Sequence, residues 1–394
     1  MKKLFKDAHI IDGNGIHYNG SIEILNDRIN KIYNSEFIND LSCYDEVIDC
    51  KGKTIIPGMM DAHVHLCMIP GEDSFSMNNA NDATLVLNCI ENAQKHLKSG
   101  FTFVRDLGNN KFIEIGVRDA IKEGRIDGPD ILCAGRMITM TGGHGHDIGF
   151  EVDGVVSAQK AARENFKKGA DCLKIMATGG VLTPGVNPKS TSLDEEEIRA
   201  AVNEAKKRGA TTASHAQGTE GIKNAVRAGI SSIEHGIWLD DEAIELMKEN
   251  GTFLVPTLVA PHFILEAGVE KGVPKQAVDK CEILYKDHHE SFKKAVKAGV
   301  KIALGTDAGT PYNLHERGAE ELILMNQNGM SPMDTIVTAT KNTAELFNVL
   351  ADYGTIDEGK YADIVILSEN PLDNLETIRD VYAVYKKGKE VYKK

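Results

Sequence analysis

The sequence predicts an α/β protein built as a (β/α)8 barrel of the TIM type, with a small β-sandwich beside it. Short apolar runs alternate with amphipathic stretches from about residue 52 to 330, and eight such units fit into that length. Both ends of the chain show a different, strand-like pattern. Strand–helix alternation is typical of a parallel sheet, and eight units over roughly 250 residues is the usual size of such a barrel.

The eight predicted strands are short apolar segments, each followed by a stretch with helical spacing of its apolar residues. They are 54–60 continuing into 61–66, then 101–107, 130–138, 171–177, 211–216, 231–239, 252–259 and 301–308. Two of the predicted helices carry clear end signals. The helix over 194–208 begins with an aspartate N-cap and an acidic first turn, and the helix over 240–250 ends at Gly251.

The two ends of the chain are predicted to form one domain. Residues 1–51 alternate apolar and polar side chains between turn signals such as DGNG, and residues 354–367 and 381–394 have the same character. We expect these segments to pair in a composite β-sandwich. The predicted domains are 1–55 with 352–394 for the sandwich, and 56–351 for the barrel.

Composition excludes several classes of partner. The 394 residues carry 45 basic and 58 acidic side chains, a formal charge of −13, which disfavours nucleic acid. No apolar run has the length of a signal peptide or of a membrane span, so no membrane association is expected. The seven cysteines lack C-x-x-C spacing and are predicted to be free thiols, which favours the cytoplasm.

Polar residues recur where the predicted barrel strands end. The carboxyl ends of barrel strands meet at one mouth, and the two histidines of the first strand, spaced H-x-H, point to the same face. Four imidazoles, one carboxylate and one lysine are costly to bury together without a cation among them. The sequence therefore predicts a metal site made of His63, His65, Lys174, His215, His235 and Asp307.

Several motifs make the chain similar to a known family. PGMMDAHVHL (57–66), the lysine of strand four, the single histidines of strands five and six, GTDAGTP (305–311) and the closing segment 342–372 resemble the amidohydrolase superfamily. VRDLG (104–108), TGGHG (141–145) and LKIMATGG (173–180) are similar to its imidazolonepropionase-like branch, which contains Xaa-Pro dipeptidases and zinc-dependent carboxypeptidases. The resemblance covers nearly the whole chain.

The resemblance implies a role for each candidate ligand. His63, His65 and Asp307 would hold the more buried of two divalent ions, expected to be zinc, and His215 and His235 the second. Lys174 would be carboxylated and bridge both ions. Asp307 would act as general base and then general acid. Histidine and carboxylate ligands also suit cobalt, manganese or iron.

Three further residues are candidates for substrate contact. His144 lies in the glycine-rich loop after strand three, and His146 follows it. Trp238, the single tryptophan, stands three residues past His235, where relatives often have a tyrosine that stabilises the oxyanion. Either the indole N–H takes that role, or Trp238 shapes the pocket or covers the barrel mouth.

Other charged residues near strand ends have weaker signals. Arg105 and Asp106 are interpreted as a buried ion pair that fixes the barrel, and His315 and Arg317 as weak candidates for binding a substrate carboxylate. The segment 260–287 is expected to form part of the rim or a lid.

The predicted function is hydrolysis of an amide bond with release of a C-terminal amino acid, as in a dipeptidase, a carboxypeptidase or an N-acyl amino acid hydrolase. The alternative is a cyclic-amide hydrolase of the imidazolonepropionase or hydantoinase kind. Lys174 argues against the former, which works with one metal. A non-enzymatic binding subunit is disfavoured because all six site residues are present. The expected partner is a small-molecule substrate, with a homo-oligomer as the expected assembly.

Overall fold

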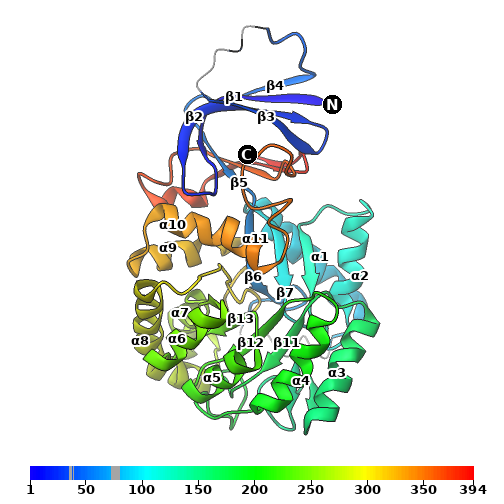
Figure 1. Ribbon diagram of the computed structural model, residues 1–394, viewed down its shortest axis with the longest axis vertical. Helices are drawn as coiled ribbons and strands as arrows, with labels where there is room; N and C mark the ends of the chain where they lie inside the picture. The colour runs from blue at the N-terminus through cyan, green and yellow to red at the C-terminus, as the bar shows by residue number, and fades with distance from the viewer. Residues whose placement is uncertain (35–37, 39, 72–79) are drawn as a thin grey trace.

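The computed structural model describes residues 1–34, 38, 40–71 and 80–394, and these form a barrel beneath a terminal β-domain (Figure 1). Within this part of the chain, no helix is both long and apolar enough to cross a bilayer. The β-domain has one hydrophobic core of its own, and the main core of the barrel also includes Ile56, Val365 and Val384 from the terminal sheet. The predicted fold class, a TIM barrel with a composite β-sandwich, is confirmed.

The barrel wall consists of parallel strands in two hydrogen-bonded groups. The strands are β6 (Met59–Val64), β7 (Phe101–Asp106) and β8 (Asp130–Cys133), then β11 (Leu173–Met176), β12 (Thr212–Ala216), β13 (Ser232–His235) and β14 (Phe253–Val255). The amide of Asp171 donates to Cys133 O across one gap between the groups. The predicted strand 130–138 is interrupted at Gly135, and the chain resumes as β9 (Ile138–Met140), which pairs with β10 (Phe150–Val152).

The eighth barrel position is an extended segment rather than a regular strand, which corrects the prediction for 301–308. Leu254 N donates to Lys301 O, and His65 N donates to Ala308 O, so the segment still closes the barrel between β14 and β6. Near the end of this segment Asp307 has a φ of 59°, which lies outside the β-strand region. That turn places the Asp307 side chain at the barrel mouth.

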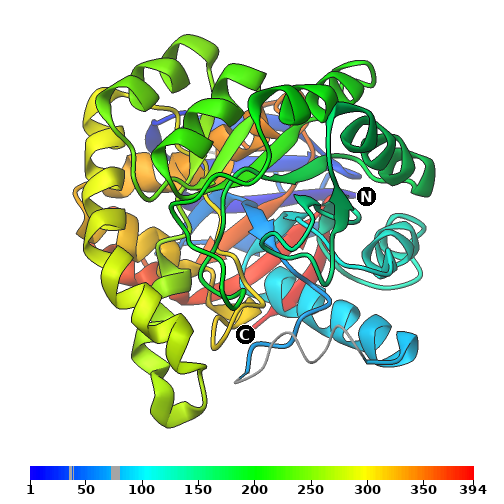
Figure 2. The ribbon, with the colours of Figure 1, turned by 90° about the horizontal axis from the view of Figure 1, so that it is seen from below.

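Helices surround the strands on the outside (Figure 2). They are α1 (Asp82–Lys98), α2 (Ile113–Lys122), α3 (Val155–Lys168), α4 (Glu195–Lys206), α5 (Thr219–Ala228), α6 (Asp241–Asn250), α7 (Val259–Ala267), α8 (Lys275–Ala298), α9 (Ala319–Gln327), α10 (Pro332–Val337) and α11 (Thr343–Leu346). The predicted end signals are confirmed. Asp194 and Glu197 form a capping box at α4, and Gly251 ends α6 with a φ of 65°.

The two ends of the chain share one eight-stranded sheet. Its strands are β1 (Lys2–Ile11), β2 (His17–Leu25), β3 (Arg28–Asn34), β4 (Glu46–Asp49), β5 (Thr54–Pro57), β15 (Ile364–Leu367), β16 (Val381–Lys386) and β17 (Lys389–Lys393). A bulge between Phe5 and Ala8 divides β1, whose first half pairs with β4 and whose second half pairs with β5. The sheet thereby folds over a core that includes Phe5, Ile22, Ile364 and Tyr385.

Strand β5 belongs to this terminal sheet and not to the barrel, which corrects the expected continuous strand from residue 54. Ile56 pairs with Val365, and the barrel strand starts only at Met59. Gly58 lies between the two strands, where an added Cβ would come within 2.2 Å of Thr102 Oγ1. The predicted domain limit at residues 55 and 56 therefore falls inside β5.

Candidate metal centre and active-site cavity

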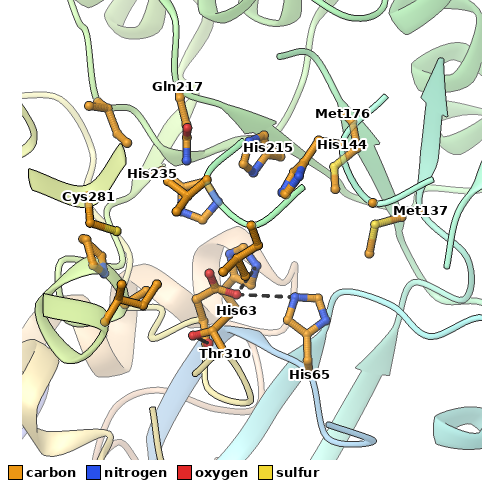
Figure 3. Close-up of a pocket in the computed structure, with 18 of the residues that line it drawn as sticks. His63, His65, Met137, His144, Met176, His215, Gln217, His235, Cys281 and Thr310 are labelled. Atoms are coloured by element: carbon orange, nitrogen blue, oxygen red, sulfur yellow. Dashed lines mark hydrogen bonds and ion pairs between the residues drawn. The ribbon is translucent and has the colours of Figure 1, made fainter. Parts of the chain in front are cut away.

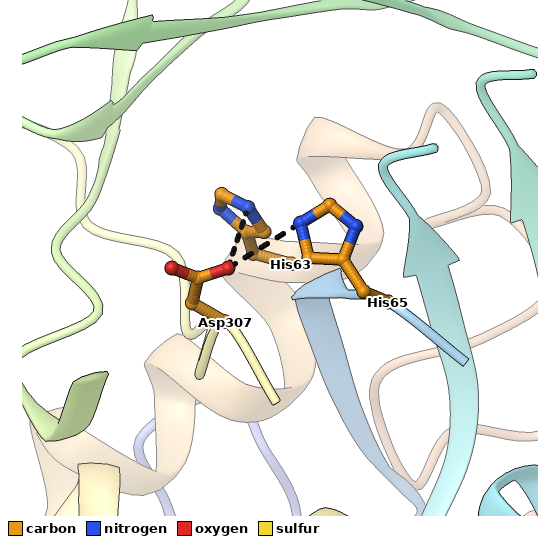
Figure 4. A group of neighbouring side chains, drawn as sticks. All are labelled: His63, His65 and Asp307. Carbon is orange, nitrogen blue, oxygen red and sulfur yellow. Dashed lines mark ion pairs between the residues drawn. The ribbon is translucent and has the colours of Figure 1, made fainter. Parts of the chain in front are cut away.

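Strand β6 delivers the first two imidazoles to the barrel mouth. His63 Nε2 lies 3.3 Å and His65 Nε2 lies 3.4 Å from the same oxygen, Asp307 Oδ1 (Figure 4). One ligand atom from each residue lies within 4.8 Å of the others. Both histidines are buried, so the three side chains form a compact N, N, O donor set with the ligand chemistry of a divalent cation site.

The far ring nitrogens of both histidines are already engaged. His63 Nδ1 lies 2.9 Å from Glu234 Oε2, and His65 Nδ1 lies 3.2 Å from Gly108 O. Both partners are acceptors, so each Nδ1 carries the proton and each Nε2 keeps a lone pair directed at the shared site. Burial, followed by the nearby Lys174, keeps the pKa of His63 well below its usual value, which favours this neutral state.

Strands β12 and β13 place two more imidazoles beside this group. The ring centroids of His215 and His235 are 4.7 Å apart, and those of His235 and His63 are 5.3 Å apart. His215 Nε2 lies 2.8 Å from Gly179 O, and His235 Nδ1 lies 2.7 Å from Thr257 Oγ1. Each ring therefore has one nitrogen held by the protein and one available to a ligand.

Lys174 lies at the centre of the group. The side chain is on β11 and is 1% exposed, and its Nζ lies 3.2 Å from His63 Nε2. Burial lowers the pKa of Lys174 to about 8, although Glu234 and Asp307 act in the opposite direction. The neutral amine of Lys174 is therefore easier to reach than that of an exposed lysine.

Backbone strain is concentrated at the same strand ends. His235 and Asp307 have φ values of 73° and 59°, and Thr257, the partner of His235, has a φ of 52°. Such conformations cost on the order of 1–3 kcal/mol each for non-glycine residues and persist where the surroundings enforce them. Asp61 supplies part of that enforcement, since its carboxylate accepts from His63 N and from the Thr306 amide and hydroxyl.

Glu234 was not predicted as a site residue. It is fully buried directly before His235 in β13, and Arg105 NH2 donates to Glu234 Oε1 at 3.0 Å. The expected ion pair between Arg105 and Asp106 is wrong, because Asp106 instead accepts from the amides of Leu66 and Gly108. The available signal was a glutamate directly before a predicted ligand in a barrel strand, where a buried carboxylate needs a cationic partner.

His144 lies at the cavity with the six predicted ligands. Its ring centroid is 4.5 Å from that of His215, and His144 Nδ1 lies 2.7 Å from Thr183 Oγ1. Burial, followed by Lys174, lowers the pKa of His144 to about 3, so the ring is a neutral hydrogen-bonding group. Gly180 makes room for it, because an added Cβ there would lie 2.5 Å from His144 Nε2.

Trp238 is not brought into this cavity. Its indole Nε1 donates to Asp287 Oδ2 at 2.7 Å, and Lys189 Nζ lies 4.5 Å from the ring centroid, in a separate outer depression. His146 pairs with the exposed Asp147. His315 Nε2 contacts Met68 O, and Arg317 lies over the Phe263 ring, so neither lines the cavity.

The cavity has polar and apolar sides (Figure 3). The histidines stand between Cys281 on one side and Met137 with Met176 on the other. Helices α7 and α8 contribute Pro261, Ile264, Cys281, Leu284 and His288 to the lining. The prediction that 260–287 forms part of the rim is consistent with this placement.

A family model matches most of the chain. The match is to the amidohydrolase family and covers residues 54–391. The chain belongs to this family. It is therefore an enzyme that hydrolyses carbon–nitrogen bonds, and the predicted family branch is confirmed.

Individual relatives agree with this assignment. The ochratoxinase of Aspergillus niger is 30% identical over 367 residues, which cover 84% of this chain and 73% of the relative. The crystal structure of a Xaa-Pro dipeptidase with bound methionine in the active site superimposes with a TM-score of 0.93 at 34% identity. A prolidase complexed with N-methylphosphonate-L-proline superimposes with a TM-score of 0.92 at 29% identity. Both structural matches cover 100% of each chain.

Divalent metals are general in this family, and the residues present fit them. The two Nε2 lone pairs of His63 and His65 converge on the Asp307 carboxylate, and their Nδ1 protons are tied to acceptors. Ligand histidines in metal sites have the same second hydrogen bond. The His63, His65 and Asp307 group is therefore suited to a divalent cation.

Proposed function

We propose that the protein is a binuclear metal-dependent amidohydrolase that cleaves a peptide or N-acyl bond and releases a C-terminal amino acid. The observation that carries the proposal is the buried Lys174, whose Nζ lies 3.2 Å from His63 Nε2 in the cavity that His65, His215 and His235 also line. Dipeptidase and prolidase structures among the relatives support an amide substrate.

The six predicted ligands divide into two sets. His63, His65 and Asp307 would hold one ion, and His215 and His235 the other, with zinc as the proposed metal. The neutral amine of Lys174 would add carbon dioxide, forming a carbamate and releasing a proton, and this anion would bridge the two sets. When bound, the two cations polarise the scissile carbonyl and acidify water to give the nucleophile.

The remaining steps fall to the chain's own groups. Burial alone would raise the pKa of Asp307, but the positive charge around it, to which Lys174 contributes, lowers the pKa and keeps the carboxylate ionised. Asp307 Oδ1 therefore takes a proton from the attacking water and passes it to the leaving nitrogen. His144 would donate a hydrogen bond to the substrate. Trp238 could take part only after its bond to Asp287 is broken.

Two measurements test the proposal. Metal analysis of the purified enzyme should give two equivalents per chain, and a library of dipeptides and N-acyl amino acids should release a free amino acid. Hydrolysis of cyclic amides alone would favour the cyclic-amide alternative, and a single metal equivalent would then favour its imidazolonepropionase kind. Two equivalents with no product from the library would contradict release of an amino acid.

Location and assembly are also proposals. All seven cysteines are free thiols in the structure, six of them buried, which suits a cytoplasmic location. A homo-oligomer is proposed from the family resemblance. Light scattering of the purified protein measures the assembly directly.

A further inference from the structure

Five apolar side chains lie together in the lining of the cavity. Helix α8 presents Cys281 and Leu284, which are 0% and 1% exposed, and α7 adds Ile264. Ile237 after β13 and Val181 after β11 pack against them in one hydrophobic cluster. We call these five residues the α8 wall.

Charged groups are missing from this wall. Among the described residues that line the cavity, Lys174 and Asp307 are the only lysine, arginine, aspartate or glutamate side chains, and both belong to the proposed metal group. A charged substrate side chain against the α8 wall would be desolvated without a counter-ion, whereas an apolar one would gain from burial.

A side-chain amide with an unpaired oxygen also lines the cavity. Gln217 is 4% exposed, lines the cavity, and its Oε1 has no hydrogen-bond partner among the described residues. Figure 3 shows its side chain directed toward the space beside His235 and His215. Buried polar atoms in native proteins are paired in most cases, so an unpaired amide in a cavity indicates a ligand that supplies the partner.

We infer that the α8 wall binds a large uncharged side chain of the substrate, of leucine, methionine or phenylalanine size, and that Gln217 hydrogen-bonds the substrate backbone next to it. The inference rests on the proposed function and narrows it. The specificity-determining residues are then Cys281, Leu284 and Ile264, and the polar contact is Gln217.

Leu284 has a matched control one position away. Ile283 is on the same helix and 70% exposed, outside the cavity. We expect Leu284→Gln to weaken binding of N-acetylleucinamide about 10- to 100-fold in calorimetry, with Leu284→Met and Ile283→Gln within about threefold of the parent. Binding of N-acetyllysinamide should be at least about 100-fold weaker than that of N-acetylleucinamide in the parent.

The result that overturns the subsite is equal binding of the two amides, or an equal effect of Leu284→Gln and Ile283→Gln. This measurement needs no turnover. The binding result is therefore independent of the dipeptide library. If no member of that library is hydrolysed, amide hydrolysis is contradicted, but the measured affinities still test the subsite.

Replacing Gln217 should change stability and catalysis in opposite directions. In Gln217→Leu, an unpaired buried amide is removed, so the melting temperature of the free protein should rise by about 2 °C. The substrate loses a hydrogen bond, so kcat/KM should fall about 10-fold. A lower melting temperature would show that the amide has a partner inside the protein, and the assignment would be wrong.

A second set of contacts involves Lys280, also on α8. From these contacts we infer that Lys280 has a positioning role. Its Nζ lies 2.8–3.1 Å from four carbonyl oxygens, those of Gly180, Val181, Thr183 and Val186. The loop held in this way supplies Val181 to the α8 wall and follows Gly179, whose carbonyl contacts His215. Lys280 therefore fixes the loop against α8.

Hydrogen exchange measures this role without turnover. Lys280→Met should speed amide exchange of the 179–187 peptide at least about 10-fold, because the ammonium and its hydrogen bonds are lost. With a leucine-containing substrate, KM should rise about 10-fold and kcat should stay within twofold. Lys275→Met, which removes only an exposed pair with Asp279, is the control. Unchanged exchange in Lys280→Met, or equal changes in both variants, would overturn the assignment.

Discussion

Glu234 Oε2 lies 2.9 Å from His63 Nδ1, while the other oxygen of the same carboxylate accepts from Arg105 NH2 at 3.0 Å. Glu234 thus links a proposed metal ligand to a guanidinium buried in the barrel wall. Through this contact the tautomer of His63 is set before any metal binds, because the carboxylate can only accept.

Glu234→Gln should weaken metal binding at the His63 group by about 10- to 100-fold. The amide is a poorer acceptor than the carboxylate, and it leaves Arg105 without a counter-charge. Competition with a chelator, read by metal analysis, measures the affinity. Glu242→Gln, an exposed glutamate paired with Lys223 and Arg227, serves as the control and should bind metal normally. Equal affinities in both variants would contradict the role of Glu234.

Asp307→Asn should lower kcat by a factor of about 10²–10⁴, because the amide cannot carry a proton from water to the leaving nitrogen. Metal analysis must accompany the kinetics, since Asp307 Oδ1 also faces His63 and His65. Loss of activity at unchanged metal content supports the proton-transfer role. Full activity in the metal-loaded variant would exclude it.

Gly180→Ala should reduce activity with little effect on stability. The new methyl group would lie within 2.6 Å of three ring atoms of His144, and the imidazole can move away only by leaving its place at the cavity. We expect kcat/KM to fall about 10-fold or more, with a melting temperature within 2 °C of the parent.

Gly116→Ala is the matched substitution for that experiment. Gly116 lies within α2, and an added Cβ meets nothing within 4 Å. This variant should be fully active and more stable by about 0.5–1 kcal/mol, as expected for alanine in place of a helical glycine. If both variants behave alike, the space at Gly180 has no bearing on His144.

Asp363 should make stability depend on pH. Burial, followed by the nearby Asp130, raises the pKa of Asp363 to about 6. The unfolded chain loses this proton near its ordinary pKa of about 3.9, so between those values the native state binds more protons and stability falls as pH rises. This pKa shift corresponds to about 3 kcal/mol of free energy of unfolding. The stabilisation is present in full below about pH 4 and is lost as the pH rises through about 6.

Asp363→Asn should remove this dependence, because Lys387 N can still donate to the side-chain oxygen while no charge develops. Denaturant unfolding at pH 4.5, 5.5 and 7.5 measures it. The free energy of unfolding of Asp363→Asn should rise relative to that of the parent as the pH rises. Asp127→Asn, at an exposed pair with Lys389, should show no such trend. A constant difference between Asp363→Asn and the parent would contradict the buried protonated state.

The residues of the candidate site were largely predictable from the sequence. Parallel barrel strands must end at one mouth, so a polar residue at a strand end is placed there by topology alone. His63, His65 and Asp307 meet for this reason, although Asp307 is more than 240 positions from both histidines in the chain. Local signals fixed helix ends equally well, as Asp194 and Gly251 show.

Tertiary structure decided the contacts between side chains. From the sequence alone, Arg105 could pair with any nearby carboxylate. Only the packed barrel shows that its partner is Glu234 and not the adjacent Asp106. Trp238 follows a site histidine, yet α8 supplies Asp287 and holds the indole outside the cavity. The apolar run from residue 54 does not reveal that β5 pairs with β15, more than 300 residues away. Strand ends follow from periodicity and topology, whereas partners depend on distances that only folding sets.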